Sequence, residues 1–233
     1  MKLLTTAIAA IWMALPGALV AQDSPVVVEL FTSQGCSSCP PADKLMHELA
    51  KRDDVIPLAL HVDYWDYIGW KDEYAQAAFT KRQRGYARVA GRKMIYTPQM
   101  VINGQDDVVG AHSMELADLI ARHRDLPGRV TVMAQRNGDT IKIQAEAKSA
   151  PAGGALLIHL VQYTPERTAH ITRGENAGRD LTYANVVHSW TVLGEWDARG
   201  PLDVESEISV ELPAVVLIQQ QGPGAIVAAA RLE

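Results

Sequence analysis

The chain has 233 residues, of which about half are hydrophobic and about a fifth are charged, and its formal net charge is −5. This length accommodates one or two domains, each able to bury its own hydrophobic core. A domain that binds nucleic acid usually carries a basic face, so the acidic balance argues against a nucleic-acid partner.

Residues 1–21 have the pattern of a secretory signal peptide. Lys2 gives a positive start, an apolar stretch follows, and small residues precede a cleavage position after Ala21. The alternative is a single membrane anchor, because the stretch Leu3 to Val20 is just long enough for a marginal span. We expect cleavage, a periplasmic or secreted location, and no stable membrane insertion of the remaining chain.

Residues 25–125 predict an α/β domain. A β-branched run starting at Val26 reads as a buried strand, and Pro40-Pro41 suits the first turn of a helix, where a missing backbone donor costs least. A second helix is expected over 72–84, with Gly85 as its stop, and Ser113 is the expected cap of a third. The expected strands are 26–31, 55–62, 99–103 and 108–111.

Residues 127–233 predict an all-β, sandwich-like domain. Short apolar runs alternate there with turns rich in Gly, Pro, Asn and Asp, such as Arg136-Asn137-Gly138-Asp139. The polar run Arg173 to Gly178 is expected to be a long turn between strands, with a second site as the alternative. The expected strands are 130–133, 140–145, 155–163, 185–193, 208–212, 215–219 and 225–230.

The chain has two cysteines, Cys36 and Cys39, and they lie between a predicted strand and a predicted helix. A structural disulfide is one interpretation, but closing so short a loop stabilises a fold by only about 2 kcal/mol. A zinc site is another, although zinc usually takes four ligands and the chain has no second cysteine pair.

Thiol chemistry is the interpretation that this position favours. Cys36 is expected at the amino terminus of the helix, where unpaired backbone N–H groups favour its thiolate. The thiolate would attack a substrate disulfide, and Cys39, one turn further on, would resolve the mixed disulfide.

Three features make residues 25–125 resemble the thioredoxin superfamily. They are the strand that leads into Cys36-Ser-Ser-Cys39, the pair Thr97-Pro98 just before a strand, and the run Val108 to Ser113 before an amphipathic helix. A closer resemblance is to the uncharacterised family of exported bacterial proteins known as domain of unknown function 1223. It rests on three segments: Phe31 to Asp43, His61 to Asp66, and Arg173 to Gly178.

The thioredoxin resemblance implies roles for several residues. Pro98 would be cis and face Cys36, and Thr97 would help to bind an extended substrate peptide. Glu29 would be a buried acid that takes the proton from Cys39, although a Glu that points to solvent is the alternative. Independently of the resemblance, Tyr64 and Trp65 follow the carboxyl end of the second expected strand, the edge where ligands bind in open α/β sheets. They would line a substrate groove, or they would simply cover the core.

The sequence therefore predicts an exported thiol–disulfide oxidoreductase that acts on protein thiols, exchanges electrons with a redox partner and uses no cofactor. A metal-binding or metal-delivery protein, which would use the cysteines with His61 or His112, is the alternative. A third possibility is a binding module that has lost catalysis.

Overall fold

The computed structural model describes residues 24–149, 154–208 and 211–232, and the predicted signal peptide lies outside them. Within these residues, helices and strands alternate in the first half, and strands alone follow in the second. None of the helices in this part of the chain is long and apolar enough to cross a membrane.

The first half runs strand, helix, strand, helix, strand, strand, helix, as the sequence predicts. Its elements are β1 (Val26–Thr32), α1 (Pro40–Leu49), β2 (Val55–His61), the short 3-10 helix η1 (Asp66–Ile68), α2 (Ala77–Val89), β3 (Gln99–Ile102), β4 (Asp106–Val109) and α3 (Ser113–Arg124).

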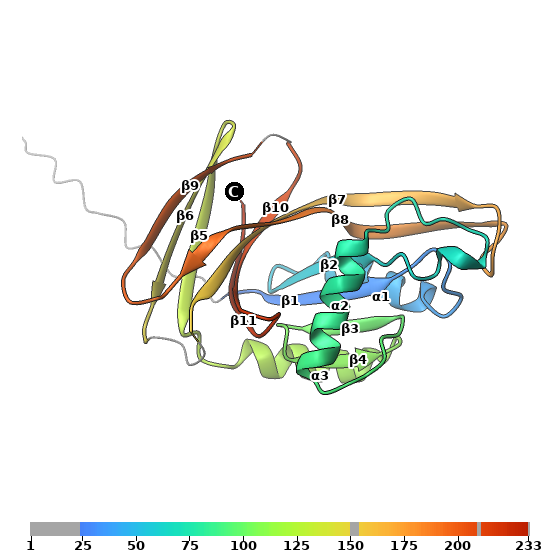
Figure 1. Ribbon diagram of the computed structural model, residues 1–233, viewed down its shortest axis with the longest axis horizontal. Coiled ribbons are helices and arrows are strands. Elements are labelled where there is room, and N and C mark those ends of the chain that lie inside the picture. The colour runs from blue at the N-terminus through green and yellow to red at the C-terminus, as the bar shows by residue number, and fades with distance from the viewer. Residues whose placement is uncertain (1–23, 150–153, 209–210, 233) are drawn as a thin grey trace, which may run out of the picture.

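The second half is built of strands, two of them long enough to run the length of the molecule (Figure 1). They are β5 (Val130–Asn137), β6 (Thr140–Ala147), β7 (Leu156–Ile171), β8 (Arg179–Trp196), β9 (Leu202–Glu207), β10 (Ala214–Gln220) and β11 (Ile226–Arg231).

Both halves contribute to one large sheet. Among the described residues, eight strands pair in the order β11-β10-β7-β8-β2-β1-β3-β4, and β5-β6-β9 form a small second sheet. The two halves meet where β8 pairs with β2, at Val186 and Ala59. The protein is thus a mixed α/β fold, and its large sheet extends across the predicted boundary near residue 126, which remains a prediction.

The two faces of the large sheet bury different cores. On one face, α1 and α3 pack on the side chains of Val28 and Leu30. On the other, α2 packs on Val27 and Phe31, together with residues of β7, β8 and β10. A further core lies between the small sheet and β7, β10 and β11. Because side chains alternate along a strand, consecutive residues of β1 serve opposite faces.

Several element boundaries differ from the prediction. Helix α2 begins at Ala77 rather than at residue 72 and continues through Gly85. Gly85 is needed for close packing there, because a Cβ at this position would come within 2.5 Å of Pro223. Residues 209–210 of the expected strand 208–212 lie outside the described residues, and the described residues beside them are not in a strand. Strand β9 was not expected.

Candidate functional site

The two cysteines lie in the turn that joins β1 to α1. Cys36 and Cys39 form a disulfide, with 5.4 Å between their Cα atoms. The backbone N–H of Cys39 donates to the carbonyl oxygen of Cys36 at 3.3 Å, so the turn closes on itself. The helix starts at Pro40, whose missing N–H suits a first helical position. Cys39, rather than Cys36, is therefore the residue at the helix cap.

Both cysteines are buried in this structure. Cys36 is 1% exposed and Cys39 is 0% exposed. The exposed Ser38 hydroxyl lies 3.4 Å from the sulfur of Cys36, close enough to hydrogen-bond with it. A Cβ on Gly35 would come within 3.2 Å of Trp65 and Ile68, so glycine permits the segment after β2 to press against the cysteine turn.

The predicted proline lies beside this turn. The Thr97–Pro98 peptide bond is cis, as the thioredoxin resemblance implied. Gln99 pairs with Phe31 in the sheet, so Pro98 lies where β1 runs into the cysteine turn. The indole N–H of Trp65 donates to the Thr97 hydroxyl at 2.7 Å.

The predicted aromatic residues form a half-buried cluster next to Thr97. The rings of Tyr64 and Trp65 lie 6.3 Å apart, and Trp65 stacks on the exposed Tyr67. The burial of Tyr64 raises the pKa of its hydroxyl to about 12. Trp65 thus contacts both Thr97, next to Pro98, and Gly35 of the cysteine turn, and the Tyr64 ring lies beside the Trp65 ring.

Glu29 is buried, but it lies on the other face of the sheet. Its carboxylate accepts hydrogen bonds from the Arg82 guanidinium at 2.6 and 3.0 Å, and the Tyr86 hydroxyl also donates to it. Arg82 and Tyr86 both belong to α2, whereas the cysteines precede α1. The structure therefore does not bring Glu29 together with Cys39.

A different acid, Asp43, occupies the face of α1 that follows Cys39. It lies four residues further along, and its backbone N–H donates to the Cys39 carbonyl oxygen at 3.1 Å. Residues four apart share one side of a helix, so Asp43 and Cys39 lie on the same side of the start of α1. Thr32 donates to its Oδ1 at 2.8 Å, and its buried Oδ2 has no hydrogen-bond partner among the described residues.

Burial dominates the electrostatics of Asp43. It raises the pKa of the Asp43 carboxyl to about 7, although the nearby His61 ring and the hydrogen bond from Thr32 act in the opposite direction. Among the residues that the structure describes, no arginine or lysine compensates the charge of this carboxylate, in contrast to Glu29. Asp43 therefore changes its protonation state near neutral pH.

A buried His–Asp pair lies next to Asp43. His61 pairs with Thr32 across β1 and β2, so its side chain faces α1, and its Nδ1 lies 2.7 Å from Asp72 Oδ2. The same oxygen accepts the backbone N–H of Gln34 at 2.8 Å. Burial alone would raise the pKa of Asp72, but the His61 ring and the hydrogen bonds that Asp72 accepts lower it. Asp72 thus couples His61 to the cysteine turn.

The two histidines considered as metal ligands occupy different environments. His61 is buried, whereas the side chain of His112 is 70% exposed and lies 3.4 Å from Glu115. Among the described residues, no three His, Cys, Asp or Glu side chains form a group that could hold a metal ion.

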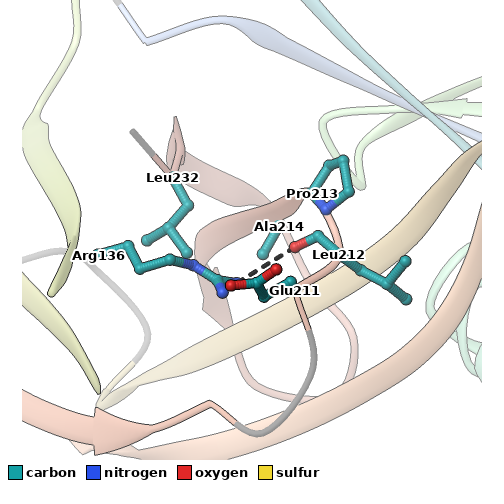
Figure 2. Close-up of a pocket in the computed structure, with 6 residues that line it drawn as sticks. All are labelled: Arg136, Glu211, Leu212, Pro213, Ala214 and Leu232. Carbon is teal, nitrogen blue, oxygen red and sulfur yellow. Dashed lines mark hydrogen bonds between the residues drawn. The ribbon is translucent and has the colours of Figure 1, made fainter. Parts of the chain in front are cut away.

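A cavity of about 290 Å³ opens at the other half of the protein (Figure 2). It lies between the end of β5 and the start of β10, where Arg136 donates to the Leu212 carbonyl oxygen at 3.3 Å. None of the predicted site residues lines it. Its lining residues are Arg136, Glu211, Leu212, Pro213, Ala214 and Leu232.

Sequence analysis missed three residues that surround the cysteines. Asp43 lies in the predicted helix after the two cysteines, and its spacing of four residues from Cys39 is a usable signal. Residue 72 is the expected start of the second helix, so no role in the site follows for Asp72. Asn176, whose side chain donates to the Cys36 carbonyl oxygen at 3.0 Å, comes from a turn 140 residues further along the chain, and no local pattern predicts that contact.

Comparisons with known proteins place the chain in a family. The family described as "Protein of unknown function (DUF1223)" matches residues 27–228. A crystal structure of protein AGR_C_4864 from Agrobacterium tumefaciens is 35% identical, has a TM-score of 0.78, and aligns over 91% of this chain and 96% of that one.

A second solved structure, HBP35 of Porphyromonas gingivalis, has a TM-score of 0.62 at 13% identity and aligns over 90% of this chain and 74% of that one. At this identity the similarity concerns the fold alone. A search of the curated proteins gave no match. With most of its length matched by the family, the chain belongs to DUF1223, a family of proteins of unknown function.

Proposed function

We propose that this protein is an exported thiol–disulfide oxidoreductase that acts on protein thiols. The observation that carries the proposal is the Cys36–Cys39 disulfide in the turn before α1, with a buried carboxyl one helical turn beyond it. A disulfide that closes so short a loop adds little to stability, so redox chemistry is the better reason for its presence.

The proposal includes a thioredoxin-like domain followed by a β-sandwich-like domain. The element order in residues 25–125 supports the first part, as do the parallel pairing of β1 with β2 and the antiparallel pairing of β1 with β3. The core between the small sheet and β7, β10 and β11 supports the second. The signal-peptide pattern and the disulfide both fit an oxidising, periplasmic or extracellular location.

The reaction moves two electrons through the cysteine pair. In the reduced protein, the Cys36 thiolate attacks a substrate disulfide, and the displaced substrate sulfur leaves as a thiolate that takes up a proton. Cys39 then loses its proton and attacks the Cys36 sulfur, which restores the Cys36–Cys39 bond and releases the second substrate thiol. The substrate gains two electrons and two protons, and the reverse sequence oxidises a substrate dithiol.

Asp43 takes the acid–base role that the sequence suggested for Glu29. It lies one helical turn after Cys39, to whose carbonyl oxygen its backbone N–H donates. One oxygen of its carboxyl has no hydrogen-bond partner among the described residues, and the pKa of the carboxyl is raised to about 7. A group with such a pKa accepts and returns a proton efficiently near neutral pH. Glu29 is held instead by the permanent charge of Arg82.

The test is reduction of insulin by dithiothreitol, followed for the wild type and for Cys36→Ala, Cys39→Ala and Ser37→Ala. We expect the wild type and Ser37→Ala to accelerate the reaction and Cys36→Ala to abolish it. Cys39→Ala is expected to accumulate a mixed disulfide with the substrate, which mass spectrometry detects. An inactive wild type that binds Zn(II) or Cu(I) stoichiometrically through the reduced cysteines would overturn the proposal in favour of metal binding.

A further inference from the structure

The turn between β7 and β8, residues 172–178, lies against the cysteine turn. Figure 1 shows the tip of this hairpin at the same end of the molecule as the segment between β2 and α2. Six of its seven residues are exposed, and only Asn176 is buried, at 1% exposure. A single inward-facing polar residue in an otherwise exposed turn requires partners of its own.

The partners of Asn176 are the backbone of the cysteine turn. Its amide nitrogen donates to the carbonyl oxygens of Gln34, at 2.8 Å, and of Cys36, at 3.0 Å. Its side-chain oxygen accepts a hydrogen bond from Arg179 at 2.8 Å. Asparagine offers two N–H donors and an acceptor at its amide, and here both ends of the amide are engaged.

Apolar contacts hold the same two turns together. The Ile68 side chain lies within 3.2 Å of the position of a Cβ on Gly35 and within 3.7 Å of one on Gly174. The Trp70 indole N–H donates to the side chain of Gln34 at 2.7 Å, and the Trp70 side chain also packs against Gly174. The cysteine turn, the segment after β2 and the β7–β8 turn therefore interlock.

The burial of Cys36 is the consequence that matters chemically. Exchange requires an attacking or attacked sulfur to approach Cys36 directly, and a residue that is 1% exposed offers no such approach. The residues packed on this turn must move before any substrate reaches the disulfide.

We propose that the β7–β8 turn is a cover over the Cys36–Cys39 pair and that Asn176 is the positioning residue that holds this cover closed. The inference rests on the proposed function, since it concerns access of protein substrates to those cysteines. In the closed form, the disulfide is protected from bulk thiols. A protein substrate that displaces the turn reaches it.

Asn176→Asp tests the cover with minimal change of shape, because an ionised carboxylate cannot donate to the two carbonyl oxygens. The measurement is the rate at which dithiothreitol reduces the disulfide of the folded protein, followed by trapping the freed thiols with iodoacetamide. We expect Asn176→Asp to raise this rate about tenfold or more, since two buried hydrogen bonds are lost.

Asn185→Asp is the matched control. Asn185 lies on β8 of the same hairpin and donates to the Pro57 carbonyl oxygen at 2.9 Å, away from the cysteine turn. Its positive φ of 49° is one that Asp also tolerates. We expect the reduction rate of this variant to stay within about twofold of the wild type. Equal acceleration in both variants would indicate general loosening and would overturn the assignment to Asn176.

Arg179→Ala keeps the inference testable if Asn176→Asp does not fold. Arg179 is exposed and reaches Asn176 from outside, so its loss is expected to raise the rate by a smaller factor, about threefold. A wild-type disulfide that is reduced as fast as an exposed model disulfide would contradict the cover. Because this assay uses no protein substrate, an inactive wild type in the insulin assay counts against the proposed function and leaves the cover standing.

Discussion

Two buried carboxyl groups, on opposite faces of the large sheet, show how differently one fold treats the same chemical group. Glu29 faces α2 and is met by the Arg82 guanidinium, the Tyr86 hydroxyl and, through them, Gln219 of β10. Asp43 faces the sheet from α1 and receives one hydrogen bond, from Thr32. Its neighbours His61 and Asp72 carry opposite charges when both are ionised.

The difference separates a site that holds the fold together from the site that we propose to be reactive. Glu29 is compensated by a permanent cation, Arg82. The Arg82 guanidinium also donates to the Gln219 side chain of β10 at 3.0 Å, which links this ion pair to the second half of the chain. Asp43 has no such cation in the described part of the chain, and burial raises the pKa of its carboxyl to about 7. A carboxyl group poised between two protonation states beside a cysteine pair is suited to chemistry rather than to holding the fold together.

The largest expected effect on stability comes from removing the charge of Glu29. Glu29→Gln leaves the Arg82 charge buried without its partner, and we expect the free energy of unfolding in urea to fall by about 3–5 kcal/mol. The exposed pair of Glu48 and Lys51 provides the control, because Glu48→Gln is expected to cost less than about 1 kcal/mol. A loss below about 1 kcal/mol for Glu29→Gln would mean that this ion pair does not stabilise the fold.

Asp43 is expected to make the stability of the fold depend on pH, because its carboxyl is buried without a compensating cation. Its folded pKa is raised from 3.8 to about 7, so the folded state holds a proton that the unfolded state releases. Stability is therefore greatest below about pH 4 for this group and falls as the pH rises to 7, by about 3 kcal/mol.

Asp43→Asn removes that dependence. We expect the stability of the variant relative to the wild type to rise by about 3 kcal/mol between pH 4 and pH 7, because all other titrating groups are the same in the two proteins. Urea unfolding of both oxidised proteins across this range measures the difference. Asp106→Asn, which also alters an Asp beside a histidine but on β4, serves as the control. A variant whose pH profile follows that of the wild type would show that Asp43 titrates normally.

His159 is a buried base that lies near Arg82, the partner of Glu29. Burial and then the charge of Arg82 lower the pKa of His159 to about 3, so the ring stays neutral in the fold while Nδ1 accepts from the Trp190 indole at 3.0 Å. The unfolded state binds a proton below about pH 6.5 and the folded state does not, so stability falls as the pH drops through this window.

At pH 5 this destabilisation is expected to reach about 2 kcal/mol, with a slope opposite in sign to that of Asp43. His159→Gln keeps an acceptor for the indole. Because the Asp43 contribution is the same in both proteins, we expect the stability of the variant relative to the wild type to rise by about 2 kcal/mol as the pH falls from 8 to 5. Thermal unfolding of the wild type and of His159→Gln across this pH range measures the difference. A stability difference between the two proteins that does not change with pH would contradict the role given to His159.

Local patterns predicted the elements around the cysteines well. The run from Val26, the prolines after Cys39 and the apolar strand from Val55 each carry their own signal, and all three appear at nearly the expected bounds. The cis Thr97–Pro98 bond followed from resemblance rather than from composition. The two strands and the helix start depend on residues that are close in sequence, so hydrophobic periodicity and turn residues predict them.

The parts of the site that could not be predicted from the sequence depend on contacts between segments that are far apart in the chain. Asp72 looks like the start of a helix, but its carboxylate is used by His61 and Gln34, and α2 starts later. Glu29 is a buried acid, as the thioredoxin resemblance implies, but the alternation of side chains along β1 turns it toward α2 and away from the cysteines. Asn176 contacts the cysteine turn only because a long hairpin brings it there.

The central claim is that Cys36 and Cys39 exchange electrons reversibly, and their reduction potential tests it most directly. Native protein is equilibrated with glutathione buffers of graded ratio, and the fraction of free thiols is measured after trapping. We predict reversible exchange with a potential between about −270 and −120 mV, the range of thiol–disulfide enzymes. A pair that stays oxidised to below about −300 mV, as structural disulfides do, would contradict the account.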